Sequence, residues 1–464
     1  MKISHLILGL LGFVVLFFIG KLIPSLTLKT TFLIIVPLIL FCFIFANLRI
    51  GLFIFIFVVP FTQQLTIGNI GIDVGTDDLF IIVIILSWLV SLVKSKELHF
   101  LKTPLNMPIA TYFTSGIFSY IFGIMRFGPV AILVCFLHLM KLLEYVMIYF
   151  IAVSVIKNLE QVKKFTNMFF FVTTVVVIIQ LYAILTGGPV NISSFSPEEE
   201  NVLGIAAMST FGSNAILGAY YCFFIFIILS ILIDSPTFKG KIPLIILAFM
   251  LSFGLFNTYS RSAYVGFIIG IFVLAMLKER KLLILFFILL LASPILMQST
   301  VLERITATAT IKSTTLVFDE ATNVRFYLWN KAVQGFLKAP LLGTGYWTTR
   351  WVIAGQTGAH TEAHNQFLAV LVEGGLVGFL IYIWLLVRMY KNAFNLKRNA
   401  NSFFLKGLGV GYIAGFSALL ASCFTSENLE AFRMIGPLWF MTALITSANR
   451  ILERQSSKPD IDST

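Results

Sequence analysis

Charged residues are scarce in this chain. Asp, Glu, Lys and Arg together make up 12% of its 464 residues, whereas 58% are hydrophobic and the mean hydropathy is +0.96. A soluble chain of this length carries about 25% charged residues and divides into two or three domains. The shortage of charge excludes that class. The composition predicts a protein that crosses a membrane many times.

Cysteine is also sparse, with four residues in the chain. All four lie inside apolar runs, and none belongs to a C-x-x-C pair: Cys42, Cys135, Cys222 and Cys423. A disulfide framework or a thiolate metal site needs cysteines in pairs or clusters. The sequence therefore favours buried, unpaired cysteines, and we expect neither a metal nor another cofactor.

No concentrated basic stripe accompanies the net charge of +12. The 33 Lys and Arg residues stand in short clusters between apolar runs. Such clusters orient membrane spans by staying on the cytoplasmic side, whereas a nucleic-acid site gathers its cations on one surface. No nucleic-acid partner is expected.

Apolar runs long enough to cross a bilayer fill the chain almost from end to end. One helical span needs about 20 apolar residues, which predicts an all-α, polytopic bundle of about 12–14 spans. The runs lie near residues 5–23, 30–47, 51–67, 78–94, 105–124, 129–156, 165–186, 213–233, 242–259, 262–278, 282–298, 364–390, 403–424 and 433–451. The first run lacks a small-residue cleavage pattern, so it is predicted to be a span and not a signal peptide.

Alternation of these spans places most Lys and Arg residues on one side. If Met1 is cytoplasmic, that side receives the basic clusters within 94–102, 157–164, 239–241, 278–281, 388–398 and 450–458. Basic residues of short loops remain in the cytoplasm. Both termini are therefore expected there.

Acidic residues collect on the opposite side. Asp77 and Asp78 stand in one predicted external loop, and Glu430 stands in another. Within the sixth span, Lys141 and Glu144 lie three residues apart on one helix face. We expect these two to pair, because an isolated charge inside a membrane is costly.

One predicted external segment, residues 299–363, is much longer than the other loops. A connection of this length is usually functional or disordered. Apolar side chains recur here every four residues, the period of an amphipathic helix, at Val324, Leu328, Ala332 and Phe336. We therefore expect an ordered helix that lies on the membrane face.

A turn follows this helix. Pro340 ends the helix because it lacks an N–H group, and Gly343 and Gly345 permit backbone angles that other residues avoid. Tyr346 and Trp347 come next, and such amphipathic rings favour the wet edge of a bilayer. We expect the two rings to lie at that edge.

Arginines at the external ends of spans are candidates for anion binding. Arg261 stands in N-T-Y-S-R-S-A-Y-V-G, where a helix N-terminus adds free N–H groups and a positive dipole end. It can equally reach lipid headgroups while Ser260 caps the helix. Arg325 shares a helix face with Trp329 four residues later, and is either a ligand group or a solvated charge. Further external arginines would together suit a phosphate-containing ligand: Arg126, Arg304, Arg350 and Arg433.

His364 opens the twelfth span from the outside and precedes Asn365. With an ordinary pKa of about 6.5, histidine can serve as a general base, although a lone histidine can also be a structural hydrogen-bonding group. His360 and Glu362 beside it make too small a ligand set for zinc. Glu373, two turns into the same span, is costly at that depth, which favours either a function or a partner on a close helix.

These segments resemble the bacterial O-antigen ligase and O-antigen polymerase superfamily, polytopic membrane glycosyltransferases of the GT-C type. The matching motifs are S-T-F-G-S-N-A-I-L-G at 209–218, S-R-S-A-Y-V-G at 260–266, N-V-R-F-Y-L-W at 323–329, P-L-L-G-T-G at 340–345 and H-N-Q-F-L-A-V-L-V-E-G-G-L-V-G at 364–378. They occur in the family's order, whereas the N-terminal half matches only in its hydrophobic layout. Where the family often has N-P-N, this chain has Gly212-Ser213-Asn214.

The resemblance implies an outward-facing site for an undecaprenyl-diphosphate-linked glycan donor at the bacterial inner membrane. By motif position, Arg261 and Arg325 would hold the diphosphate. His364, supported by Asn365, would assist the acceptor hydroxyl in a metal-independent, inverting transfer. Other substrate contacts are expected from Arg126, Arg350, Trp329 and Glu373.

The same resemblance suggests partners and a division of the chain. A glycan or lipid acceptor, membrane lipids and envelope polysaccharide assembly proteins are expected partners in making lipopolysaccharide or exopolysaccharide. The parts are N-terminal transmembrane helices over 1–204, an O-antigen ligase-like membrane domain over 205–454 with an extracytoplasmic loop at 299–363, and a cytoplasmic tail over 455–464.

Several functions stay open at this point. Ligase and polymerase place similar groups around the same donor and differ in the acceptor. A transporter or flippase of lipid-linked glycans is the alternative, and would show paired halves and charges at the membrane midplane. A non-catalytic assembly scaffold is a third hypothesis, but it leaves the arginines and the histidine unexplained.

Overall fold

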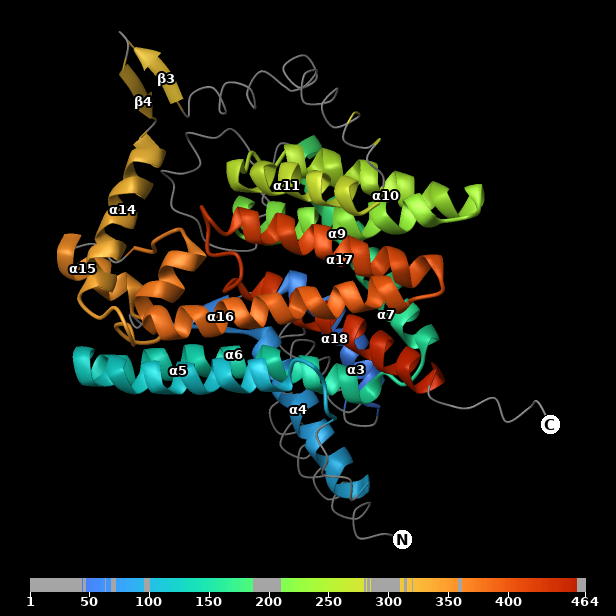
Figure 1. Ribbon diagram of the computed structural model, residues 1–464, viewed down its shortest axis with the longest axis horizontal. Coiled ribbons are helices and arrows are strands. Elements are labelled where there is room, and N and C mark those ends of the chain that lie inside the picture. Colours follow the sequence, from blue (N-terminus) through green and yellow to red (C-terminus); the bar gives the residue numbers. More distant parts are fainter. Residues whose placement is uncertain are drawn as a thin grey trace, which may run out of the picture.

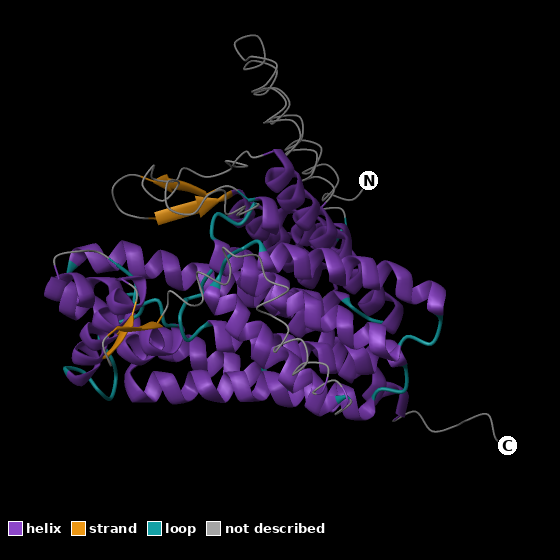
Figure 2. Ribbon diagram, turned by 90° about the horizontal axis from the view of Figure 1, so that it is seen from above, coloured by secondary structure: helices purple, strands orange, loops and turns teal. Residues whose placement is uncertain are grey.

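The computed structural model describes residues 44, 47–62, 64–67, 72–95, 101–186, 210–278, 281, 284, 309–312, 315–318, 320–357 and 361–456. Within these ranges the chain is a helical bundle with two short hairpins at its edge (Figure 1, Figure 2). The predicted all-α membrane bundle is confirmed. The hairpins were not predicted.

The described helices follow one another along the whole bundle. Their bounds are α3 (Leu48–Val58), the 3-10 helix η2 (Val59–Phe61), α4 (Thr76–Ser95), α5 (Asn106–Phe127), α6 (Pro129–Val155), α7 (Leu159–Thr186), α9 (Asn214–Asp234), α10 (Phe238–Phe256), α11 (Arg261–Leu277), α14 (Glu320–Leu337), α15 (Thr349–Thr357), α16 (Gln366–Asn399), α17 (Phe403–Ser422) and α18 (Phe432–Ser456). The antiparallel hairpins pair β1 (Gln64–Ile67) with β2 (Ile72–Gly75), and β3 (Ala309–Lys312) with β4 (Thr315–Phe318).

Many of these helices can cross a membrane. In the described part of the chain, seven have the required length and apolar character, and shorter apolar helices occur at α3, α4 and α11. The chain is thus a multi-pass membrane protein. Each predicted span coincides with a described helix except those near 5–23, 30–47 and 282–298, which lie almost entirely outside the described residues.

Glycines bring α9 and α17 into close contact at the centre of the bundle. Gly407, Gly411 and Gly415 recur every four residues on α17, and a Cβ on Gly411 would come within 2.5 Å of Ile227 Cα on α9. In lipid, where hydrophobicity does not drive helices together, such rows of small residues allow close backbone packing. Helix α11 packs against both partners, so this contact also fixes the position of Arg261.

Buried cysteines line the same region. Cys135, Cys222 and Cys423 are buried and form no disulfide, which confirms the prediction for the described cysteines, and Cys42 lies outside those residues. Cys222 Sγ donates to Ala263 O at 3.3 Å, a weak bond between α9 and α11.

Helix α16 is broken at Gly375, where φ is +62°. The turn at 340–345 repairs the interrupted backbone pairing. Leu376 N donates to Pro340 O at 2.8 Å, and Thr344 N donates to Val372 O at 2.8 Å. Backbone groups inside a membrane protein must find internal partners, so the turn makes the break tolerable.

Glycines on both sides permit this contact. Gly343 has a φ of +76°, and a Cβ there would overlap the carbonyl oxygen of Glu373. A Cβ on Gly375 would come within 2.5 Å of Leu341 O. The predicted tight turn is confirmed. The Gly374–Gly375 pair, which we expected to admit a neighbouring helix, admits the backbone of this turn instead.

Helix α14 is the expected amphipathic helix, and its buried face starts later than predicted. Leu328 and Ala332 are buried in a small core with Ile353 and Val372. Val324, one turn earlier, is 48% exposed. The packed part of the face therefore begins at Leu328, because α15 and α16 cover α14 from that turn onward.

Two predictions about charged residues are wrong. Lys141 Nζ lies 3.4 Å from Asp78 Oδ2, so its ion-pair partner is on α4 and is not Glu144. Asp77 and Asp78 do not stand in an exposed loop, since both are buried in the first turn of α4. There Tyr145 donates its hydroxyl to Asp77 at 2.6 Å, and the helix N-terminus favours negative charge.

Replacing Gly375 by alanine should destabilise the protein, because a left-handed backbone and a backbone clash both oppose a Cβ. Such strain costs on the order of 1–3 kcal/mol. The midpoint of thermal unfolding in detergent, followed by size-exclusion chromatography, measures the effect. Gly378→Ala is the matched control, since a Cβ there meets nothing within 4 Å. Equal midpoints in the two variants would contradict the structural role of Gly375.

Candidate active site

The N-terminus of α16 organises the candidate site. Asn365 is its N-cap, with Oδ1 accepting a bond from Leu368 N at 3.0 Å. Gln366 N donates to Cys423 O, at the end of α17, at 3.0 Å. His364 has a φ of +50°, which is uncommon outside glycine. The chain therefore turns sharply at His364 as it enters the helix bundle.

Helix α14 is fastened to this turn. Trp329 Nε1 donates to Ala363 O at 3.0 Å, and Ala363 packs with Leu328 in the small core. Arg325, one turn before Trp329, is half-buried and close enough to His364 to influence its protonation. The structure thus brings together two of the three predicted catalytic residues.

The surroundings of His364 keep its imidazole neutral. Burial lowers the pKa of His364 below its ordinary value. Of its charged neighbours, Glu362 raises this pKa and Arg325 lowers it further. Neutral imidazole is the form that accepts a proton. The turn therefore presents a base beside a cation.

Arg261 reaches the same end of the bundle on another helix. It is the first residue of α11, and Ser260 caps this helix by accepting a first-turn N–H bond at 3.4 Å, which confirms the predicted cap. A Cβ on Gly266 would come within 2.5 Å of Ala418 O, so the start of α11 packs against the end of α17. Because Gln366 is bonded to that end of α17, α11 and α16 both begin there.

The other predicted arginines have different environments. Arg350 Nη2 donates to Glu362 Oε1 at 3.1 Å, and its guanidinium lies 5.4 Å from the centre of the Trp347 ring. Arg126 is exposed in the last turn of α5. Arg433 is buried on α18 and donates to a backbone oxygen next to η2 at 2.6 Å, which indicates a structural role. Residues 304 and 360 lie outside the described part.

Glu373 is held by protein groups. It is buried in α16, where Oε1 accepts from Thr349 Oγ1 at 2.9 Å and from Thr349 N at 3.3 Å. Its backbone oxygen accepts from Ser119 Oγ at 2.7 Å. These bonds tie α5 and α15 to α16 beside the helix break. Contact of Glu373 with substrate remains a prediction.

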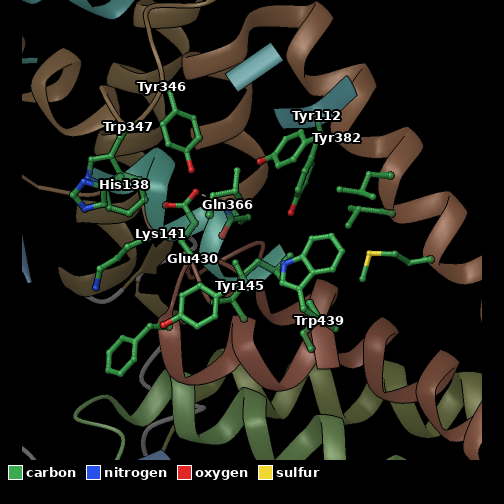
Figure 3. Close-up of a pocket in the computed structure, with 18 residues that line it drawn as sticks. Tyr112, His138, Lys141, Tyr145, Tyr346, Trp347, Gln366, Tyr382, Glu430 and Trp439 are labelled. Atoms are coloured by element: carbon green, nitrogen blue, oxygen red, sulfur yellow. Dashed lines mark hydrogen bonds between the residues drawn. The ribbon is translucent and has the colours of Figure 1, made fainter. Parts of the chain in front are cut away.

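No sequence motif predicted the cavity of about 100 Å³ beside this turn (Figure 3). It is lined from α5, α6, α16 and α18, and Gln366 connects it to His364 along the chain. Tyr346 and Trp347 also line it, so the prediction that these rings lie at the bilayer edge is wrong. The ring of Trp347 stacks on His138 with 4.0 Å between centres, because the turn at 340–345 is bound to α16 and directs the following residues inward.

Acidic residues between α17 and α18 stand at the edge of this cavity. Gln366 Nε2 donates to Glu430 Oε1 at 2.6 Å. Burial raises the pKa of Glu430 well above its usual value, and the nearby carboxyls of Glu373 and Glu427 raise it further. Burial likewise raises the pKa of Glu427 to about 8. These groups therefore hold protons near neutral pH.

Changing the charges around His364 should move its pKa in opposite directions. Arg325→Gln removes a positive charge and should raise this pKa, whereas Glu362→Gln should lower it. NMR titration of ¹³C-labelled histidine in the solubilised protein measures both, and His364→Gln identifies the signal. Lys338→Gln, just beyond α14, is the control. A response to Lys338→Gln as large as that to Arg325→Gln would contradict the described proximity.

Comparison with known proteins agrees with the motifs. Residues 245–383 match the family described as O-antigen ligase. This segment includes Arg261, Arg325 and His364, together with the turn at 340–345. No curated protein matches the chain. The family supports glycosyltransferase-like processing of membrane glycans, of the ligase or polymerase type. The resemblance seen in the sequence is thus confirmed, and through residues 245–383 the chain belongs to the O-antigen ligase family.

Proposed function

We propose that the chain transfers or polymerises oligosaccharide from an undecaprenyl-diphosphate-linked donor at the outer face of the bacterial inner membrane. One observation carries this proposal: Arg325 lies near a neutral His364 at the N-terminus of α16, inside the family segment. Transfer from a diphosphate to a hydroxyl needs a cation for the leaving group and a base for the nucleophile.

The arginines would stabilise the leaving group. When the bond between the anomeric carbon and the diphosphate breaks, negative charge grows on the phosphate oxygens. Arg325 and Arg261 carry planar groups that bind such oxygens in pairs, and the N-terminus of α11 adds its positive dipole end. Cations placed in advance stabilise this charge in the transition state, which would make a metal ion unnecessary.

His364 would remove the proton from the acceptor hydroxyl. The hydroxyl oxygen then forms a bond to the anomeric carbon on the side opposite the departing diphosphate, which inverts the configuration there. A lowered pKa suits this role because the imidazole is unprotonated before the reaction. Asn365 would support the base through the helix cap, since its Oδ1 is bonded to Leu368 N.

The orientation follows from the ends of α16. Its last turn carries Lys397 and Arg398, and basic residues at span ends favour the cytoplasm. The opposite end, which begins after His364, would then face outward, where flipped lipid-linked glycans are presented. This orientation also agrees with cytoplasmic termini.

Buried charges support a second candidate, a transporter of lipid-linked glycans. Asp77, Asp78 and Lys141 lie between α4 and α6, and charges inside a membrane domain are common in transport pathways. However, each acid has one oxygen bound to Tyr145 or Lys141, which a structural role also explains. After gene deletion, a missing transporter leaves lipid-linked units on the cytoplasmic leaflet, whereas a missing transferase leaves them on the outer leaflet.

Deletion also separates the two types of transferase. A missing polymerase leaves single repeats attached to their final acceptor, because ligation continues without chain growth. A missing ligase leaves long chains attached to their lipid carrier. The surface and lipid-linked glycans of the deletion strain therefore assign the activity.

Loss of Arg261 or His364 should abolish most transfer. A general base or a preorganised charge contact each contributes about 100- to 1000-fold to a rate, so Arg261→Ala and His364→Ala should each reduce transfer by about that factor. Polymer is measured in the deletion strain, with the amount of membrane-inserted protein quantified by immunoblot. Lys391→Ala, exposed on α16, is the control. Normal polymer from both site variants would refute the proposal.

The transfer rate should fall in acid. Protonation of His364 removes the base, and because burial lowers its pKa, the decline should begin below the ordinary value of about 6.5. Initial rates of the purified enzyme against pH, with saturating donor, measure this limb. The residual rate of His364→Ala should lack it. A limb that persists in that variant would assign the base to another group.

A further inference from the structure

Polar groups converge at one end of the cavity beside Gln366. Figure 3 shows the hydroxyls of Tyr112, Tyr346 and Tyr382 directed toward Gln366 and Glu430. Gln366 is 2% and Tyr382 is 6% exposed. Within the described residues, Gln366 Oε1 and the Tyr382 hydroxyl have no hydrogen-bond partner. An unsatisfied buried polar atom costs about 1–3 kcal/mol, so these two atoms point to a bound polar molecule.

The charges around the cavity do not suit an anion. Its lysine, Lys141, is paired with Asp78 at 3.4 Å. Glu430 stands at the polar end, and Glu373 lines a small adjoining cavity with it. A phosphate or carboxylate would therefore meet two acids and a cation already paired. Because burial raises the pKa of Glu430, this side chain is a neutral group that can both donate and accept hydrogen bonds.

The rest of the wall is aromatic and aliphatic. Trp347 and Trp439 contribute rings, and Leu386 and Met389 extend the apolar surface. Ligand sites commonly combine such walls with a few polar groups that fix orientation. A sugar ring has the same division, because its C–H faces are apolar and its hydroxyls are polar.

The size of the cavity limits its occupant. One water needs about 10–15 Å³ by the same measure, so a volume of about 100 Å³ accepts several water-sized groups. That space suits one sugar ring and is too small for a long isoprenoid chain. The ligand would enter past Gln366, two residues after His364.

We propose that this cavity binds one uncharged sugar ring of the glycan substrate, with hydroxyls bonded to Tyr382, Gln366 and Glu430. The proposal rests on the proposed transferase function, which supplies glycan at His364. The ring comes either from the acceptor, whose hydroxyl would then face His364, or from the sugar end of the donor. In both cases the acid-lined cavity would exclude the diphosphate and leave it to the arginines.

Two variants test the site in the full-length protein. Tyr382→Phe removes the unpaired hydroxyl and keeps the ring. Gly378→Val fills the adjoining cavity, where a Cβ meets nothing within 4 Å. Their matched controls are Tyr390→Phe, whose hydroxyl bonds Ser417 outside the cavity, and Gly355→Val, which also has open space around its Cβ.

The probe is the repeat-unit oligosaccharide released by mild acid from the lipid-linked donor of the encoding strain. Its binding to purified protein is measured by equilibrium dialysis. Loss of one hydrogen bond should weaken binding about three- to tenfold in Tyr382→Phe, and Gly378→Val should weaken it more. Both controls should bind as the unmodified protein does.

The outcomes separate the site from the proposed function. Unchanged binding in both variants would overturn the site, as would displacement of the oligosaccharide by undecaprenyl phosphate, which would indicate an isoprenoid site. In transfer assays, a raised KM for acceptor alone assigns the ring to the acceptor, and a raised KM for donor alone assigns it to the donor. If the oligosaccharide binds as expected but the unmodified protein transfers nothing, the site stands and the proposed function fails.

Discussion

The pairing between the broken helix α16 and the turn at 340–345 is the constraint on which the candidate site depends. A helix interrupted inside a membrane protein exposes backbone groups that lipid cannot satisfy. Here the turn supplies their partners, with bonds such as Leu376 N to Pro340 O at 2.8 Å. Because α14 leads directly into this turn, the repair also holds Arg325 near His364, and it directs Tyr346 and Trp347 into the cavity.

Electrostatics divide the site into two environments. Arginines on α11 and α14 stand at the end of the bundle where α16 begins, where they would bind an anion. Beyond Gln366, buried acids and phenols make a cavity that suits an uncharged ligand. Burial explains both halves of this arrangement, since it keeps His364 neutral as a base and keeps Glu430 neutral as a hydrogen-bonding group. One donor molecule could therefore have its diphosphate and its sugar recognised separately.

Local patterns predicted local structure well. Apolar runs gave the described spans, Ser260 capped its helix as expected, and the glycines at 343 and 345 formed the tight turn. The same patterns failed where a partner came from a distant segment. Lys141 and Glu144 share a helix face, yet α4 brings Asp78 to the lysine, and no spacing along the chain encodes that meeting.

By itself, the sequence determined the membrane class, most spans, the order of the family motifs and the residue types available for chemistry, because these depend on hydrophobic length and on neighbours within a few residues. Only the tertiary structure decided which of these residues meet. It placed Arg325 beside His364, assigned Glu373 to Thr349, and assembled a cavity from tyrosines on α5, on α16 and after the turn. The physical reason is that burial, ion pairing and backbone repair act between segments far apart in the chain, and packing alone brings those segments together.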